Sequence, residues 1–217
     1  MTDTSIDANA LNIFHRPARV IVAGASDTGK SCLVSKLILK YHENFQVIII
    51  CGVSTHSLQD NTNISSKLVI SKDIVDPENY KVSVDDNVLM VLDDCYKTAS
   101  DSELICDLFT RGRHIGVSVV FVTQNIFSRG KYSRDISLNA SHIILLRVRD
   151  ISQIKTLGGQ IFGPGKPTNN FTSVYQELVS NKRYGYILID LAPYGPPELR
   201  IRTNIVNEEM YETAIEL

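Results

Sequence analysis

A glycine-rich motif near the start of the chain constrains its fold more than any other feature. Residues 24–31 read GASDTGKS and match the pattern G-x-x-x-x-G-K-S. The apolar segment 19–23 before the motif is typical of a short buried strand, and residues 32–40 after it place apolar side chains on one helical face. A strand, a tight turn and a helix in this order bring backbone N–H groups together where they can hold a phosphate. The motif therefore predicts an α/β fold with an anion site at the turn.

Each residue type in this motif has a chemical reason. Glycines let the backbone approach phosphate oxygens and adopt positive φ angles. Lys30 is expected to reach the β- and γ-phosphates of a nucleotide, and the Ser31 hydroxyl is expected to bind Mg²⁺. The alternative is a glycine-rich turn that binds nothing. The predicted nucleotide-binding residues are Gly24, Ala25, Ser26, Asp27, Thr28, Gly29, Lys30, Ser31 and Cys32.

Further apolar segments alternate with helical patterns along the chain. This alternation favours a mainly parallel sheet between two layers of helices, the three-layer α/β sandwich of P-loop NTPases. The tail differs, because segments 184–190 and 198–202 indicate an antiparallel hairpin, and the alternating apolar and charged residues of 198–202 are typical of an exposed edge strand. We expect residues 1–17 to form an amino-terminal arm and residues 18–217 a single domain. The predicted central strands are 19–23, 46–50, 88–92, 117–122 and 142–146.

Polar side chains follow two of the predicted strands. Asp93 and Asp94 come directly after segment 88–92, as in a Walker B site, where Asp93 would hold Mg²⁺ through water. Asp94 would then orient and deprotonate the attacking water as a catalytic base. Gln124 follows segment 117–122, whose carboxyl end should lie beside the P-loop, so its amide would contact the γ-phosphate and the water. The alternatives are a helix N-cap pair for the acids and a polar strand end for Gln124.

Two arginines lie near the end of a predicted helix. A capping box in residues 100–103 predicts where this helix begins, and Gly112 predicts where it ends. Arg111 and Arg113 flank the glycine. They are either favourable charges at a helix end or an arginine finger that reaches a neighbour's nucleotide from the mouth of the sheet, with Arg113 the preferred finger. The glycine pair in segment 157–160 is expected to stop another helix.

A basic loop follows Gln124. The chain has a formal net charge of −2, so any contact with DNA must come from a local patch rather than from an overall positive field. The loop carries Arg129, Lys131 and Arg134 together with one aromatic residue, and these three cations are the predicted contacts to DNA phosphates. The alternative is an ordinary solvated loop.

The order of these motifs resembles the FtsK–HerA superfamily of DNA-pumping ATPases. More closely, it looks like the viral genome-packaging ATPases of poxviruses, of other large DNA viruses and virophages, and of Maverick/Polinton elements. The P-loop alone is common to many NTPases, and the block from Arg-Gly-Arg-His to Thr-Gln-Asn is what narrows the resemblance to this group. The resemblance covers about residues 14–205. Many relatives carry Glu where this chain has Asp94. The supporting segments are 14–17, 24–31, 93–94, 108–114, 120–125 and 135–140.

The resemblance implies a core sheet in the order 5-1-4-3-2, counting the central strands along the chain. It also implies a homo-oligomeric ring, a pentamer or hexamer, that hydrolyses ATP with Mg²⁺ and drives double-stranded DNA into a capsid. The partners would be DNA and a capsid or portal-vertex protein, in the cytoplasm or nucleus of the host cell or in association with the virion.

Several other classes fit the sequence less well. A GTPase would need Asp-x-x-Gly after the Walker B strand and Asn-Lys-x-Asp for guanine, and segments 93–96 and 181–184 match neither. A P-loop NTPase of another class, either a small-molecule kinase or a nucleotide-dependent scaffold or switch, stays open as the alternative. No apolar run is long enough for a membrane span, the amino terminus lacks a signal-peptide pattern, and the four cysteines and five histidines show no zinc spacing.

Overall fold

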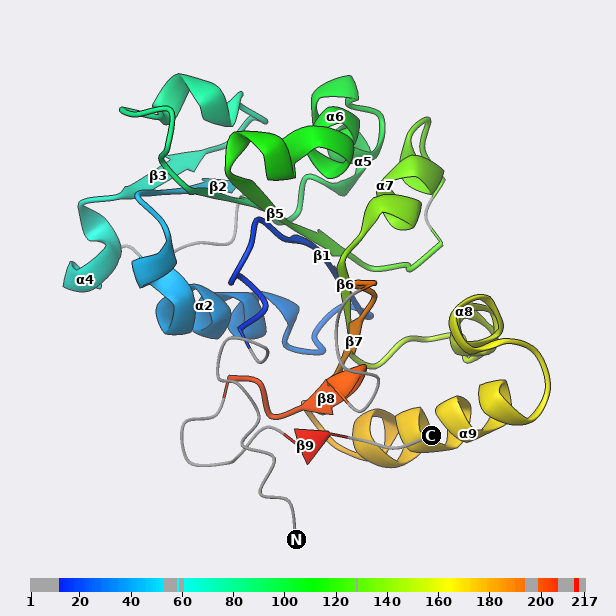
Figure 1. Cartoon of the computed structure of the whole chain (residues 1–217). Coiled ribbons are helices and arrows are strands. Elements are labelled where there is room, and N and C mark those ends of the chain that lie inside the picture. Colours follow the sequence, from blue (N-terminus) through cyan, green and yellow to red (C-terminus); the bar gives the residue numbers. More distant parts are fainter. Residues whose placement is uncertain are drawn as a thin grey trace, which may run out of the picture.

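One sheet forms the centre of the molecule, with helices on both of its faces (Figure 1). The computed structural model describes residues 12–52, 58, 61–127, 129–193, 199–206 and 213–214. In this part of the chain the sheet has nine strands in the order β3-β2-β4-β5-β1-β6-β7-β8-β9. The strands are β1 (Arg19–Ala23), β2 (Val47–Cys51), β3 (Leu68–Ser71), β4 (Val88–Leu92), β5 (Val117–Thr123), β6 (His142–Leu145), β7 (Ile187–Asp190), β8 (Ile201–Thr203) and β9 (Thr213–Ala214).

The predicted order of the core is confirmed. Neighbouring strands from β3 to β6 are all parallel, and β6-β1-β5-β4-β2 is the expected 5-1-4-3-2. Strands β7, β8 and β9 each run antiparallel to the preceding neighbour, so the predicted tail hairpin is also present. The central strands are rich in β-branched residues and buried along almost their whole length, because helices cover both faces of the sheet.

The helices divide between the two faces. Helix α2 shares a core cluster with Ile13 and Phe14, whereas α6, α7, α8 and α9 pack into the cluster on the other face. Phe14 packs edge-on against Tyr41 and Phe45, with ring centroids 5.5 and 5.3 Å away, so the inner end of the predicted arm is part of the core. The helices are α2 (Lys30–Tyr41), α4 (Thr62–Ser65), α5 (Tyr96–Ser100), α6 (Glu103–Arg111), α7 (Ser133–Asn139), α8 (Ser152–Phe162) and α9 (Lys166–Tyr175), with 3₁₀ turns at His42–Asn44, Pro77–Tyr80 and Gly112–Ile115 and a π-helical turn at Gln176–Ser180.

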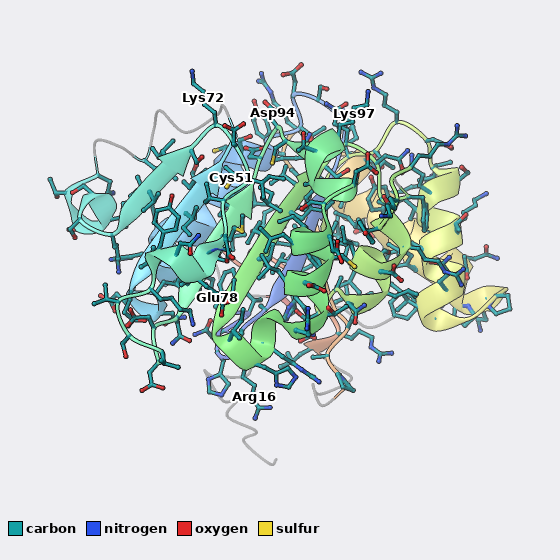
Figure 2. All side chains as sticks on the ribbon, turned by 90° about the horizontal axis from the view of Figure 1, so that it is seen from above. Arg16, Cys51, Lys72, Glu78, Asp94 and Lys97 are labelled. Carbon is teal, nitrogen blue, oxygen red and sulfur yellow. The ribbon has the colours of Figure 1, made fainter. Side chains whose placement is uncertain are left out.

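Because the parallel strands run in one direction, the sheet has a carboxyl edge, where these strands end, and an amino edge, where they begin. The carboxyl ends of β1, β4 and β5 lead into the P-loop, the acid pair and Gln124, which therefore lie at one edge. The amino ends of the same strands lie at the opposite edge. Figure 2 shows this separation, since Asp94 and Lys97 project near one end of the strands and Arg16 near the other. Within the described part of the chain, no helix has the length and apolar character that crossing a bilayer requires.

The predicted start of α6 is wrong, whereas its predicted end is confirmed, since the helix ends at Arg111 with Gly112 as its C-cap. Its N-cap is Ser102, whose hydroxyl accepts the N–H of Ile105 at 3.4 Å, while Ser100 ends the short helix α5. Gly112 has right-handed helical angles, and the chain leaves the following turn at Gly116, where φ is +67°. Gly112 is required for space instead, because a Cβ there would lie 3.1 Å from the carbonyl oxygen of Val117.

The glycine pair in segment 157–160 does not stop a helix, since α8 continues through it to Phe162. A Cβ on Gly158 would lie 2.9 Å from a ring carbon of Phe171 in α9. The glycine thus allows two helices to pack closely, and this tertiary contact outweighs its weak helix propensity.

Strand β8 is not the exposed edge strand that its charge pattern predicts. It pairs with β9, and Arg202 is only 1% exposed. The guanidinium of Arg202 lies 3.7 Å from the carboxylate of Asp190 in β7. Arg202 is therefore part of a buried ion pair, whereas Arg200, just before the strand, is exposed.

Candidate active site at the carboxyl edge of the sheet

The backbone of the phosphate-binding loop is hydrogen-bonded to the end of β5 and to the segment that follows β6. The N–H of Gly24 donates to the carbonyl of Thr123 at 3.2 Å, and the N–H of Ala25 donates to the carbonyl of Arg147 at 2.8 Å. Gly29, with a φ of 94°, is the N-cap of α2 and provides no side chain to cap it. No capping side chain therefore competes for the first N–H groups of the helix, which can bind an anion.

Lys30 lies across the mouth of this loop. Its Nζ donates to the carbonyl oxygens of Gly24 and Ala25 at 2.8 and 2.7 Å. Burial lowers the pKa of Lys30, and three carboxylates, among them Asp93 and Asp94, act in the opposite direction. These carboxylates favour the charged ammonium, which is the form that phosphate binding requires.

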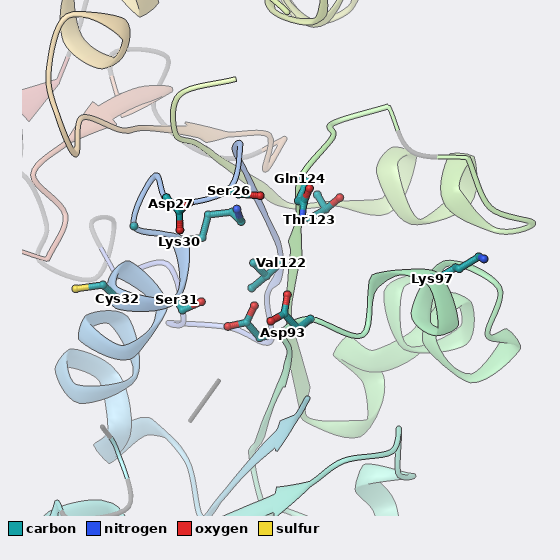
Figure 3. Close-up of a pocket in the computed structure, with 12 residues that line it drawn as sticks. Ser26, Asp27, Lys30, Ser31, Cys32, Asp93, Lys97, Val122, Thr123 and Gln124 are labelled. Carbon is teal, nitrogen blue, oxygen red and sulfur yellow. The ribbon is translucent and has the colours of Figure 1, made fainter. Parts of the chain in front are cut away.

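One cavity of about 620 Å³ brings most of the predicted residues together (Figure 3). It lies between the P-loop and the ends of β4 and β5. In Figure 3 the side chain of Lys30 extends toward Ser26, Ser31 lies on the side of Asp93, and Lys97 points away. The lining residues are Ser26, Asp27, Gly29, Lys30, Ser31, Cys32, Asp93, Asp94, Lys97, Val122, Thr123 and Gln124.

The other predicted residues of the loop, Gly24, Ala25 and Thr28, do not line the cavity. The Thr28 hydroxyl donates to the carbonyl of Ala25 at 2.8 Å. A Cβ on Gly24 would lie 2.8 Å from the side chain of Leu146. These residues therefore hold the shape of the loop, while their neighbours face the cavity.

Asp93 is held in place by the neighbouring strand. Its N–H donates to the carbonyl of Cys51 at 2.9 Å, and the residue is only 6% exposed. Gly52 follows Cys51 with a φ of 125°, and a Cβ there would lie 1.5 Å from the carbonyl oxygen of Asp93. Any side chain at position 52 would therefore displace Asp93. Gly52 is a residue of the site that was not predicted from the sequence.

Asp94 has an unusual backbone conformation. Its φ is 59°, in the left-handed region that Asn and Asp tolerate better than other residues with a side chain. Unlike Asp93 it is exposed, and both residues line the cavity. The buried acid is thus suited to hold an ion in one position, and the exposed acid is accessible to a water molecule.

The cavity residues fit Mg²⁺. The Ser31 hydroxyl and the Asp93 carboxylate both line it and provide hard oxygen donors. Across the described residues there is no group of three or more His, Cys, Asp or Glu side chains that could hold a metal ion. Mg²⁺ commonly binds through one or two side chains together with substrate phosphates. The donor set therefore fits a cation that arrives with a nucleotide.

Gln124 is exposed at the end of β5 and lines the same cavity. The hydroxyl of Thr123 donates to the carbonyl of Asn125 at 3.0 Å and accepts the N–H of Asn125 at 3.2 Å. This local turn follows the end of the strand at Thr123, so Gln124 lies at the edge of the sheet where the acids lie.

Arg111 and Arg113 do not lie at the mouth of the sheet, contrary to expectation. Helix α6 runs back from the carboxyl edge, and β5 begins at Val117 shortly after it, so both arginines lie near the amino edge. The guanidinium of Arg111 pairs with Asp107 one helical turn earlier. Neither arginine lines the cavity around Lys30.

The predicted DNA-binding loop follows the carboxyl end of β5, at the same edge as the cavity. Arg129, Lys131 and Arg134 are all exposed. The backbone N–H of Lys131 donates to the carboxylate of Asp101 at 2.7 Å, and its ammonium lies 4.7 Å from the ring centroid of Tyr132. The loop is therefore attached to the start of α6 while its cations face solvent.

A second hollow of about 640 Å³ adjoins the P-loop on the side of β6. It shares Asp27, Gly29 and Cys32 with the first cavity, so the two adjoin at these residues. Its other lining residues are more apolar than those of the first cavity and include Leu33, Lys36, Leu146, Tyr184, Tyr186 and Val206.

Tyr184 is the most exposed aromatic residue of this hollow, at 60%. A Cβ on Gly29 would lie 3.1 Å from its ring, so the ring lies close to the P-loop. A Cβ on Gly185 would lie 2.2 Å from the carbonyl oxygen of Leu178, and this glycine lets the chain pass the end of the π-helical turn. The segment Tyr-Gly-Tyr before β7 was the only sequence signal, and its nearness to the P-loop depends on the fold.

The fold and the cavity together define the class of P-loop NTPases. The solved structures with this fold include the genome-packaging NTPase B204 of Sulfolobus turreted icosahedral virus 2. Its AMPPCP complex has a TM-score of 0.58 and 16% identity, and the match covers 80% of this chain and 92% of that chain. Its AMP complex has a TM-score of 0.53 and 17% identity, covering 81% and 93%. At this identity the comparison shows a shared fold.

A further structure, described as B204, the DNA-packaging ATPase from Sulfolobus turreted icosahedral virus, matches with a TM-score of 0.53 and 17% identity, covering 81% of this chain and 94% of that one. The sequence matches no protein-family model, and no curated protein matches it.

Proposed function

We propose that this chain is the ATP-hydrolysing motor of a viral genome-packaging machine and moves double-stranded DNA into a capsid. The observation that carries the proposal is the single cavity that joins Lys30, Ser31, Asp93, Asp94 and Gln124. A nucleotide-binding scaffold requires phosphate and metal ligands. It has no use for a second, exposed acid and a strand-end amide in the same cavity, and both are expected of a hydrolase.

Each of these side chains has a role in ATP hydrolysis. Lys30 and the N–H groups at the start of α2 bind the β- and γ-phosphates, and Ser31 and Asp93 hold Mg²⁺, which would neutralise charge on the phosphates. Asp94 takes the proton of the attacking water as general base. Gln124 orients the water against the γ-phosphate.

The second hollow is suited to the base and ribose of the nucleotide. It adjoins the P-loop cavity at Asp27, Gly29 and Cys32, and a nucleotide with its phosphates on Lys30 would reach it past these residues. The exposed ring of Tyr184 offers a flat surface on which a purine can stack.

The basic loop would couple ATP hydrolysis to movement of the residues that contact DNA. It joins Gln124 to α7, so a shift of Gln124 on loss of the γ-phosphate would move Arg129, Lys131 and Arg134 as well. The description of B204 as a DNA-packaging ATPase supports DNA as the substrate.

The proposed motor is a ring in which one subunit completes the site of the next. Arg111 and Arg113 lie near the edge opposite to Lys30, so one of them would serve a neighbour's nucleotide through a head-to-tail interface. Repetition of such an interface with a rotation that closes would give the proposed pentamer or hexamer. The ring would act with a capsid or portal-vertex protein, in the host cytoplasm or nucleus or on the virion.

Phosphate release from ATP, measured with and without duplex DNA, tests the proposal. We expect hydrolysis that requires Mg²⁺, that rises several-fold when duplex DNA is added, and that is lost in Lys30→Ala. Hydrolysis that is indifferent to DNA of any length would exclude the motor. Transfer of the phosphate to a small-molecule acceptor would instead identify a kinase, and nucleotide binding without hydrolysis would identify a scaffold or switch.

A further inference from the structure

A further hollow, lined by two arginines, lies at the amino edge of the sheet. Its volume is about 260 Å³, and it shares no lining residue with the cavity around Lys30. Segments distant in the sequence meet there: the start of β1 with Arg19, the turn after α6 with Arg113, the stretch between α7 and β6 with Ser141, and residues 191–193 after β7. The hollow is therefore a product of the fold rather than of one loop.

Arg19 and Arg113 place two positive charges in this hollow. Both residues line the same hollow, and burial together with the charge of Arg113 lowers the pKa of Arg19. No acidic side chain lines the hollow among the described residues. Arg19 is partly buried and Arg113 is exposed, and the repulsion between their like charges carries a free-energy cost that a bound anion would offset.

Asp190 directly precedes residues 191–193 of the hollow, but its carboxylate interacts with other groups. It accepts the N–H of Ala192 at 2.8 Å, and its oxygens lie 3.7 Å from His142 and 3.7 Å from Arg202. Burial lowers the pKa of His142 to about 4 despite Asp190, with Arg202 and Arg19 acting in the same direction as burial. The imidazole is thus neutral at pH 7, and Asp190 serves Arg202 rather than the hollow.

Arg19 has a fixed backbone and an unfilled donor. Its N–H donates to the hydroxyl of Ser141 at 2.9 Å, and that hydroxyl contacts the carbonyl of Arg19 at 3.1 Å. The side-chain Nε of Arg19 is buried and has no hydrogen-bond acceptor within the described part of the chain. Buried polar groups normally have a partner, so Arg19 carries an uncompensated donor beside the hollow.

We propose that Arg19 and Arg113 form a phosphate-binding pocket at the amino edge of the sheet. Guanidinium groups bind phosphate oxygens through paired, charge-assisted hydrogen bonds, and two of them balance the charge of one phosphate group. The phosphoryl oxygens come either from the backbone of duplex DNA or from ATP on a neighbouring subunit. Both sources rest on the proposed function, whose substrates are duplex DNA and ATP, whereas the binding of phosphoryl oxygens by the pocket does not.

Binding of pyrophosphate to the Lys30→Ala chain, measured by calorimetry, tests the pocket, because this substitution removes the lysine of the other phosphate site. We expect Arg19→Gln or Arg113→Gln, added to Lys30→Ala, to weaken pyrophosphate binding at least about tenfold, the usual size of a lost charge-assisted hydrogen bond. Arg16→Gln is the matched control, since Arg16 is exposed near the same edge and does not line the hollow.

Arg113 is exposed, so its substitution leaves the core intact and keeps the test valid even where Arg19→Gln lowers stability. Pyrophosphate that binds equally well after Arg113→Gln, or that does not bind to the Lys30→Ala chain, would overturn the proposal.

A duplex titration separates the two sources. If DNA fills the pocket, Arg113→Gln reduces the slope of log affinity against log salt by about one. If a neighbour's ATP fills it, the slope is unchanged, and Arg19→Gln subunits regain turnover when mixed with Lys30→Ala subunits. Pyrophosphate binding that depends on Arg113, in a protein without any ATPase activity, would disprove the proposed function and support the pocket.

Discussion

At the carboxyl edge of the sheet a lysine lies among three carboxylates, whereas at the amino edge two arginines share a hollow that no acid lines among the described residues. A phosphate at the first edge would face acids and would require a cation such as Mg²⁺, for which Ser31 and Asp93 offer oxygen ligands. A phosphate at the second edge would meet positive charge directly, without a metal.

The direction of the strands explains this difference. Helices that follow parallel strands begin at the carboxyl edge and end at the amino edge, as α2 and α6 do. Helix N-termini favour anions and acids, and helix C-termini favour cations. Arg111 and Arg113 therefore lie where a purely local effect would also place them, and only experiments that treat the two edges separately can assign them a function.

The largest effect is expected for Lys30→Ala. Removal of the ammonium at the mouth of the P-loop should abolish ATP binding and turnover, because the β- and γ-phosphates lose their direct positive partner. Binding of a fluorescent ATP analogue and phosphate release provide the measurements. Turnover close to that of the unsubstituted chain would show that the carboxyl edge is not the nucleotide site.

A subunit-mixing experiment tests whether an arginine at the amino edge of one subunit acts on the nucleotide at the carboxyl edge of its neighbour. Arg113→Ala should lower turnover on the order of 10³-fold while ATP binding persists, if its guanidinium stabilises charge on a neighbour's γ-phosphate. Lys30→Ala subunits can still offer that arginine, so a mixture of the two inactive variants should recover part of the activity. If the mixture co-assembles and stays inactive, and an Arg111→Ala mixture is equally inactive, the finger in trans is wrong.

Asp94→Asn distinguishes the two acids of the carboxyl edge. Asn tolerates the φ of 59° at this position, so the substitution removes the charge and keeps the backbone. Turnover should fall at least about 10²-fold with ATP affinity retained, as for loss of a general base. Asp93→Asn is the comparison and should raise the Mg²⁺ concentration that hydrolysis requires. Unchanged turnover in Asp94→Asn would remove Asp94 from the mechanism.

The basic loop should account for DNA binding at the carboxyl edge. Replacement of Arg129, Lys131 and Arg134 by Ala should weaken duplex binding for all sequences and flatten its salt dependence by up to about three units of slope. Arg149→Ala is the control, since Arg149 is exposed beyond the end of β6 and outside the loop. An unaltered slope would place the DNA contacts elsewhere, with the amino-edge arginines as the next candidates.

The smallest effect is expected in the second hollow beside the P-loop, where the base of the nucleotide would bind. Tyr184→Ala should weaken ATP binding about tenfold, because a lost stacking contact is worth roughly 1–3 kcal/mol. Binding of inorganic tripolyphosphate should not change, and Tyr184→Phe should retain the affinity for ATP. An equal loss for ATP and tripolyphosphate would show that the substitution disturbs the P-loop rather than a base contact.

The residues that could be predicted from the sequence are those whose neighbours in space are also neighbours in the chain or lie at the ends of adjacent parallel strands. The P-loop at 24–31 is one continuous turn. Asp93, Asp94 and Gln124 follow buried strands, and parallel strands bring their carboxyl ends to one edge. Gly52 and Tyr184 could not be found this way, because their positions at the site depend on contacts with Asp93 and Gly29 across the fold.

By itself, the sequence determined the central strands and the segments of the tail hairpin, their order along the chain and the chemistry available at the carboxyl edge, since these follow from local periodicity and strand direction. The tertiary structure decided that α8 continues through its glycines, that Arg202 is buried, and that Arg113 shares a hollow with Arg19. The physical reason is that a local pattern determines the element a residue forms, whereas close packing between elements determines which groups it meets.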